Sequence, residues 1–89
     1  MDPAFAERLR GLTSRIDIER AVRELCKPYG GVRRVDLVPD GTGGQFCFVD
    51  LASPEHRMKL FYALDAVFYG GSLGFRIPLR SEQADSAAS

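Results

Sequence analysis

Two strand-like segments joined by a glycine-rich turn constrain this chain more than any other feature. Residues 32–38 read VRRVDLV and residues 45–51 read QFCFVDL, and both contain the β-branched and aromatic residues that favour strands. The residues between them, PDGTGG at 39–44, predict a turn. The two segments therefore predict a β-hairpin, and the rest of the chain has to complete a sheet around it.

Two further segments have the periodicity of amphipathic helices. Residues 16–27 place apolar residues at helical spacing, and Ser14 or Asp17 can cap their start. Residues 53–69 begin with Ser53 as a cap, followed by a proline at the first helical position. The predicted apolar stripe of this second helix is Leu60, Phe61, Leu64, Val67 and Phe68.

The remaining two strands are expected near the two ends of the chain. Residues 7–12 predict a short first strand that stops at Gly11, and residues 73–79 alternate as a last strand. Pro78 lacks a backbone donor, so the last strand should lie at a sheet edge or end there. The predicted order β-α-β-β-α-β is the α+β, ferredoxin-like sandwich, in which two helices cover one face of a four-stranded antiparallel sheet.

Length and composition indicate one small domain. The chain has 89 residues, a formal net charge of zero and 27% charged residues. Residues 1–5 and 81–89 are predicted to be disordered ends around a single domain at 6–80. There is no secretory signal pattern and no apolar run of the roughly 20 residues that span a membrane. A zero net charge argues against a strongly basic nucleic-acid binder.

The cysteine pattern predicts neither a metal site nor a disulfide framework. Cys26 and Cys47 form no CxxC pair, and the chain has a single histidine, His56. We expect two buried, reduced thiols, which suit an intracellular, cytoplasmic protein, or a nuclear one in a eukaryote. No catalytic arrangement surrounds His56, so the sequence predicts no enzyme activity and no cofactor.

The strand at 45–51 decides what the sheet offers to a partner. Neighbours two apart point to the same face, so Cys47, Val49 and Leu51 form one set, and the other set contains Phe46 and Phe48. The second set also includes Asp50, whose carboxylate is costly to bury unpaired. We therefore expect the two phenylalanines on the open face, where an apolar patch needs something to stack on it.

At these residues the chain resembles the RNA recognition motif (RRM) family, over about residues 6–80. GQFCFVDL at 44–51 is similar to the family's octamer, with Phe46 and Phe48 at the positions that stack bases. RELCKPYGGVRRVDLV is similar to the end of the family's first helix and its second strand, and ASPEHRMKLFYAL to its second helix.

The chain also departs from the family pattern. Gly44 stands where the octamer usually has Lys or Arg, Gln45 replaces its glycine, and Leu51 replaces its last aromatic residue. In the first predicted strand, Arg8 stands at the usual aromatic position, so RLRGL looks more like the quasi-RRM subclass. That subclass binds RNA with loops rather than sheet aromatics.

The resemblance implies weak to moderate binding of single-stranded RNA by base stacking on the open sheet face. The family's strand order, 4-1-3-2, would bring arginines to both sides of the two rings. We expect two to four nucleotides to be bound with roughly micromolar affinity or weaker. The nucleic-acid-binding residues implied in this way are Phe46, Phe48, Arg8, Arg10, Arg34 and Arg76.

A protein-interaction module is the alternative function. Some RRM-like domains hold a partner's tryptophan with an Arg-x-Phe before the last strand, and VFYGG at 67–71 has the aromatics and glycines but Val67 at the arginine position. Self-association through Phe46 and Phe48 is a variant of this alternative. Neither alternative requires a membrane or a metal.

Overall fold

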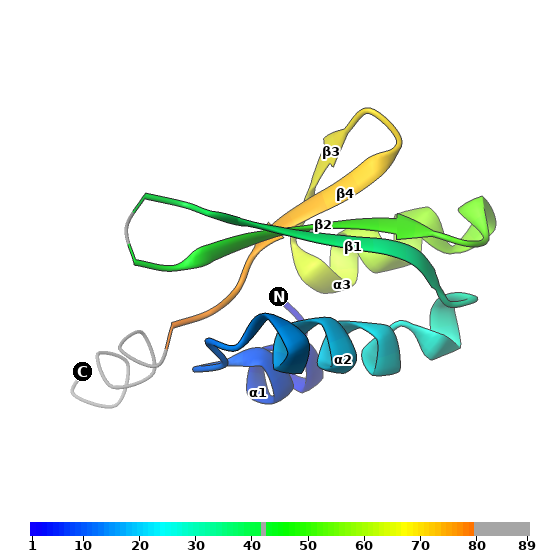
Figure 1. Cartoon of the computed structure of the whole chain (residues 1–89). Coiled ribbons are helices and arrows are strands. Elements are labelled where there is room, and N and C mark those ends of the chain that lie inside the picture. Colours follow the sequence, from blue (N-terminus) through cyan, green and yellow to red (C-terminus); the bar gives the residue numbers. More distant parts are fainter. Residues whose placement is uncertain (42, 80–89) are drawn as a thin grey trace.

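The computed structural model describes residues 1–41 and 43–79, and it has helices on one side of a sheet whose other side is uncovered (Figure 1). In chain order the helices and strands are α1 (Pro3–Leu9), α2 (Arg15–Leu25), β1 (Val32–Pro39), β2 (Gln45–Leu51), α3 (Arg57–Leu64), β3 (Val67–Tyr69) and β4 (Ser72–Arg76). Short 3-10 turns, Lys27–Tyr29 and Pro54–His56, follow α2 and precede α3.

The sheet is four-stranded and antiparallel, with strand order β1-β2-β4-β3. The predicted central hairpin forms β1 and β2, which pair from Val32 opposite Leu51 to Pro39 opposite Gln45. A second hairpin, β3–β4, turns through the residue pair 70–71 and adds the other two strands. The predicted α+β class, with a four-stranded antiparallel sheet covered by helices on one face, is confirmed.

The predicted first strand at 7–12 is wrong, because this part of the chain begins as helix α1. Asp2 caps the helix by accepting a hydrogen bond from the backbone N–H of Ala4 at 2.9 Å, and Pro3 occupies the first turn. Phe5 and Leu9, four residues apart, are buried on one face of it. The expected disorder of residues 1–5 is therefore also wrong: Phe5 anchors this segment in the core.

The predicted helix at 53–69 is shorter in the structure, because α3 ends at Leu64. Asp65 adopts the left-handed conformation (φ 54°) that terminates a helix, and Val67–Tyr69 then continues as β3. The last strand, β4, ends at Arg76, two residues before Pro78, as a proline requires. Since residues 7–12 form no strand, β4 takes the place beside β2, and β3 lies at the edge.

The core lies between the sheet and the helical layer. Helices α1 and α2 supply most of its helical side, and α3 adds Leu60 and Leu64. The sheet contributes alternate residues of β2 and β4. The fully or almost fully buried apolar residues are Phe5, Leu9, Ile18, Ala21, Val22, Cys26, Cys47, Val49, Leu60, Leu64, Ala66, Leu73, Phe75 and Ile77.

Both thiols are part of this core. Cys26 and Cys47 are free cysteines with no exposed surface, and burial raises the pKa of each to about 12. Among residues 1–41 and 43–79, no cluster of three or more His, Cys, Asp or Glu side chains could hold a metal ion. No described helix has the length and apolarity needed to cross a bilayer. The tail predicted to be disordered, 81–89, lies outside the described residues.

Candidate nucleic-acid interface

Strand β2 presents its two phenylalanines on the uncovered face of the sheet. Cys47 and Val49 are 0% and 1% exposed and belong to the core, whereas Phe46 and Phe48 are only half-buried. The alternation of a strand puts the two pairs on opposite faces. The predicted orientation of this strand is therefore confirmed.

The strand register fixes the neighbours of the two rings. On β1, Val38 lies opposite Phe46, and Asp36 lies opposite Phe48. On β4, Arg76 lies opposite Phe46, and Gly74 lies opposite Phe48. Phe48 is thus near the centre of the open face. The side chains of that face belong to Arg34, Asp36 and Val38 on β1, Phe46, Phe48 and Asp50 on β2, Ser72 and Arg76 on β4, and Val67 and Tyr69 on β3.

Gly74 allows the two rings to lie down on the neighbouring strand. A Cβ atom at position 74 would be 2.7 Å from Cε1 of Phe46 and 3.1 Å from Cε1 of Phe48, closer than side chains pack. The glycine is buried in the structure, because the rings cover its backbone. A glycine inside a strand often marks such a close approach.

A third ring joins the two phenylalanines across this glycine. The ring centroids of Phe46 and Phe48 are 5.1 Å apart, and those of Phe48 and Tyr69 are 5.2 Å apart in an edge-to-face arrangement. Since β2 and β3 are separated by β4, their backbones are roughly 9–10 Å apart, and the contact requires a position without a side chain between them. Phe46, Phe48 and Tyr69 form what we call the aromatic strip, and Tyr69 is 64% exposed.

The sequence prediction missed Tyr69 because residues 53–69 have helical periodicity. The signal that could have found it is VFY followed by two glycines, since three strand-forming residues before a two-residue glycine turn predict a hairpin. Phe68, the middle residue, points to the other face and stacks on Phe61 of α3 with centroids 4.6 Å apart. Only alternate residues of β3 therefore reach the aromatic strip.

The charged side chains of the open face are already paired. Arg34 forms an ion pair with Asp36 at 2.7 Å, and Arg76 forms one with Asp40 at 3.0 Å. Asp40 also accepts a hydrogen bond from the backbone N–H of Gly44 and so holds the hairpin turn. Counting Asp50, the described residues of this face carry two guanidinium groups and three carboxylates, and these residues give no excess of positive charge.

Asp50 is fixed beside the strip by a neighbour on β4. The hydroxyl group of Ser72 donates a hydrogen bond to Oδ1 of Asp50. Asp50 lies two residues after Phe48 on the same face, and Asp36 lies directly across from Phe48 on β1. Phe48 therefore has a carboxylate on two of its sides.

Two of the predicted site residues, Arg8 and Arg10, do not lie on the sheet. Arg8 is in the last turn of α1 and pairs with Glu24 of α2 at 3.4 Å, within the helical layer. Arg10 caps the end of α1, and its Nε is buried without a hydrogen-bond partner among the described residues. The expectation that both flank Phe46 and Phe48 is wrong because their segment is helical. Arg34 and Arg76 lie on the same face as the rings, with Arg76 opposite Phe46 and Arg34 opposite Asp50.

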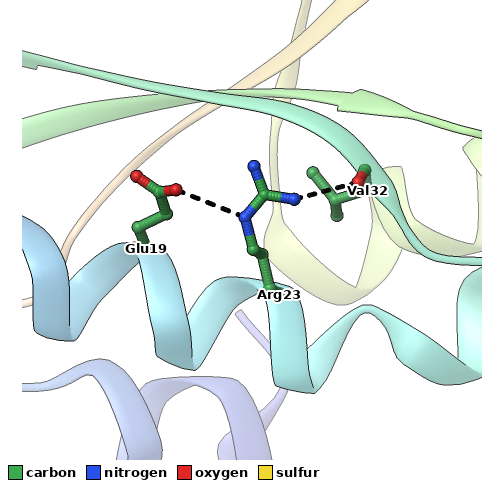
Figure 2. A network of polar contacts seen from close by, with 3 residues as sticks. All are labelled: Glu19, Arg23 and Val32. Carbon is green, nitrogen blue, oxygen red and sulfur yellow. Dashed lines mark hydrogen bonds and ion pairs between the residues drawn. The ribbon is translucent and has the colours of Figure 1, made fainter.

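Another arginine, Arg23, holds the helical layer to the sheet. Figure 2 shows Arg23 of α2 between Glu19, at 3.3 Å on the same helix, and the backbone carbonyl of Val32, at 3.1 Å on β1. This contact connects the helical layer to the outermost strand of the sheet. Arg23 thus serves the packing of the fold, away from the aromatic strip.

An antiparallel sheet with helices on one face and clustered aromatic side chains on the other is the architecture of single-sheet nucleic-acid-binding domains. A family model described as the RNA recognition motif matches residues 9–73, which is more than half of the chain. The chain belongs to this family, whose members are nucleic-acid-binding domains rather than enzymes, and membership supports RNA as its partner in general terms. No curated protein and no solved structure matches the chain significantly.

Proposed function

We propose that the protein binds single-stranded RNA by stacking unpaired bases on the aromatic strip. The observation that carries this proposal is a run of three rings, Phe46, Phe48 and Tyr69, in mutual contact on the uncovered face of a sheet from this family. Sequence-specific proteins of this kind recognise single strands, because only unpaired bases expose their faces and edges. In a duplex the base faces are stacked on one another and are out of reach of a flat sheet.

The size of the strip limits both the length and the affinity of the bound RNA. Each stacked base contributes roughly 1–3 kcal/mol, and the three rings accommodate about two to four nucleotides. Part of this free energy is spent on ordering a flexible strand. The expected dissociation constant is therefore in the micromolar range or weaker.

The arginines at the two ends of the open face provide phosphate contacts of limited strength. Arg34 and Arg76 each form an ion pair with a carboxylate, so contact with a phosphate has to compete with an existing ion pair. One or two such contacts correspond to a logarithmic salt slope of about −1 for a single strand. We therefore propose binding dominated by stacking, with a modest dependence on salt.

An NMR titration of the ¹⁵N-labelled chain with a mixed-sequence RNA tetranucleotide tests the proposal. Amide signals of β2, β3 and β4 should shift, and those of α2 should not. The double variant Phe46→Ala/Phe48→Ala should lose the shifts. Tyr62→Ala is the matched control, since Tyr62 is 72% exposed but lies on α3.

The same tetranucleotide annealed to its complement within a longer hairpin should give no shifts. The proposal fails if the wild-type chain shows no change at millimolar single-stranded RNA. It also fails if the double variant binds as well as the wild type.

A protein-interaction module is the second candidate function, and the edge strand supports it. All three residues of β3 are exposed, including Val67 at 49% and Phe68 at 46%. An exposed apolar edge strand can pair with another chain. Size-exclusion chromatography with light scattering distinguishes the two: a dimer that dissociates on Phe68→Glu substitution would favour association through β3, and a monomer at high concentration would count against self-association.

A further inference from the structure

We propose that Asp36 and Asp50 make the interface selective for bases that donate hydrogen bonds, with guanine bound best and uracil worst. This inference rests on the proposed stacking function, and it concerns which base the site prefers. Both carboxylates lie beside Phe48, the ring near the centre of the open face. The strand register thus places an acidic side chain on two sides of the ring on which a base would stack.

The geometry brings the carboxylates to the edge of a base that stacks on Phe48. Asp36 is directly opposite Phe48 on β1, so the Cβ atoms of this pair are roughly 4.5–5.5 Å apart. Asp50 is two residues along β2 on the same face, roughly 6.5–7 Å away. A base is wider than the phenyl ring beneath it, and its edge therefore extends over one of these side chains.

Each carboxylate is positioned by one partner and keeps an acceptor available. Oδ2 of Asp36 pairs with Arg34, and Oδ1 of Asp50 accepts from Ser72. Within residues 1–41 and 43–79, the second oxygen of each carboxylate accepts no hydrogen bond. The partners hold the side chains in place, and the remaining oxygens can meet a ligand.

An ionised carboxylate only accepts hydrogen bonds, so the base has to donate. The Watson–Crick edge of guanine has two adjacent donors, N1–H and N2–H, that can match the two oxygens of one carboxylate, because the oxygen that already has a partner keeps a second lone pair. Cytosine and adenine each offer an amino group. Uracil offers only N3–H, between two carbonyl oxygens that a carboxylate repels. Charge-assisted hydrogen bonds are stronger than neutral ones, which makes this difference selective.

The same carboxylates offset the two arginines among the described residues of the open face. They weaken the attraction of phosphates, and this cost falls on every RNA equally. The affinity gained by donor-rich bases comes from contacts with the bases, so it differs between RNA sequences. The two effects can therefore be separated by comparing sequences of equal length and charge.

The test uses four RNA tetranucleotides, UUUU, UUGU, UUCU and UUAU, titrated into the full chain and followed by NMR. Guanine should bind about tenfold tighter than uracil, as expected for one good bidentate base contact. UUCU and UUAU should lie between them. In the double variant Asp36→Asn/Asp50→Asn the ratio of UUGU to UUUU affinity should fall to about one to twofold, because the amides both donate and accept.

Glu24→Gln is the matched control, since Glu24 is an exposed, arginine-paired carboxylate in the helical layer. It removes one negative charge, against two in the double variant, and should leave the ratio unchanged, even if all affinities rise. Equal binding of all four RNAs to the wild type would overturn the selectivity and leave the stacking function intact. If the double variant keeps the wild-type ratio of UUGU to UUUU affinity, the selectivity is likewise overturned and the stacking function is not. Absence of binding to all four would overturn both.

Discussion

The two faces of strand β2 both carry apolar side chains, but these side chains differ in burial. Cys47 and Val49 are buried completely beneath the helices, whereas the larger Phe46 and Phe48 stay half-exposed. Hydrophobicity alone would bury the phenylalanines first. Burial therefore depends on which face of the strand the helices cover: one set of alternate residues enters the core, and the other can contact a ligand.

The largest expected difference is in thiol reactivity at neighbouring positions of β2. Cys47 and Cys26 should react with a disulfide reagent on the order of 10³ times more slowly in the folded chain than in the unfolded chain, because reaction requires unfolding. A thiol introduced by Phe46→Cys should react readily. Its rate should rise with pH towards its ordinary pKa, whereas burial keeps the native thiols protonated, with pKa values of about 12. Fast native labelling would place Cys47 at the surface.

Removing one phenyl ring from each face should separate stability from binding. Phe75→Ala on the covered face should destabilise the fold by about 3–5 kcal/mol, since Phe75 is 3% exposed and leaves a cavity. Phe48→Ala should cost about 1 kcal/mol or less, because its ring lies on the surface over Gly74. Urea denaturation measures both. Equal costs would show that the open face is part of the core.

The third ring should contribute to affinity without supporting the fold. Tyr69→Ala should weaken binding of a tetranucleotide by about 1–2 kcal/mol, roughly five- to thirtyfold, since it removes one stacking surface. Tyr62→Ala, on α3, should leave affinity unchanged. Fluorescence anisotropy with a labelled RNA measures both variants, and equal effects would remove Tyr69 from the interface.

The smallest predicted effect concerns the glycine beneath the rings. Gly74→Val should lower RNA affinity only severalfold, because its side chain lifts Phe46 and Phe48 and separates Phe48 from Tyr69. Stability should change by less than about 1 kcal/mol, since valine favours strands and the displaced rings face solvent. Unchanged affinity together with undisturbed ring signals would show that the strip does not depend on this glycine.

Local patterns predicted the parts of the fold that local interactions determine. The hairpin at 32–51, the α2 helix and the face of Phe46 and Phe48 follow from alternation, periodicity and turn residues. Residues near position 9 form a helix because Asp2 and Pro3 start α1. This helix start has a stronger effect than the few strand-like residues that follow it. Apolar Leu9 and Leu12 and the stop at Gly11 predicted a strand there, although these residues form none.

The prediction of the site succeeded where it depended on one strand and failed where it depended on strand pairing. Phe46 and Phe48 share β2, so the alternation of that strand alone places both. Tyr69 reaches them from β3, which is separated from β2 by β4. The periodicity of residues 53–69 does not show that the two strands are arranged in this way. Arg8 and Arg10 were placed by analogy, and the helix in their segment removes them from the sheet.

The central place of β4 also governs the order in which the fold can be assembled. β2 pairs with β4 through Cys47 opposite Phe75, yet residues 72–76 are the last described strand to emerge during synthesis. Until they appear, the inner edge of β2 has no neighbour, and the β1–β2 hairpin by itself is at best marginally stable. Closing this gap requires a long-range contact, which slows folding. A nascent chain halted before residue 72 should accordingly remain sensitive to proteases throughout.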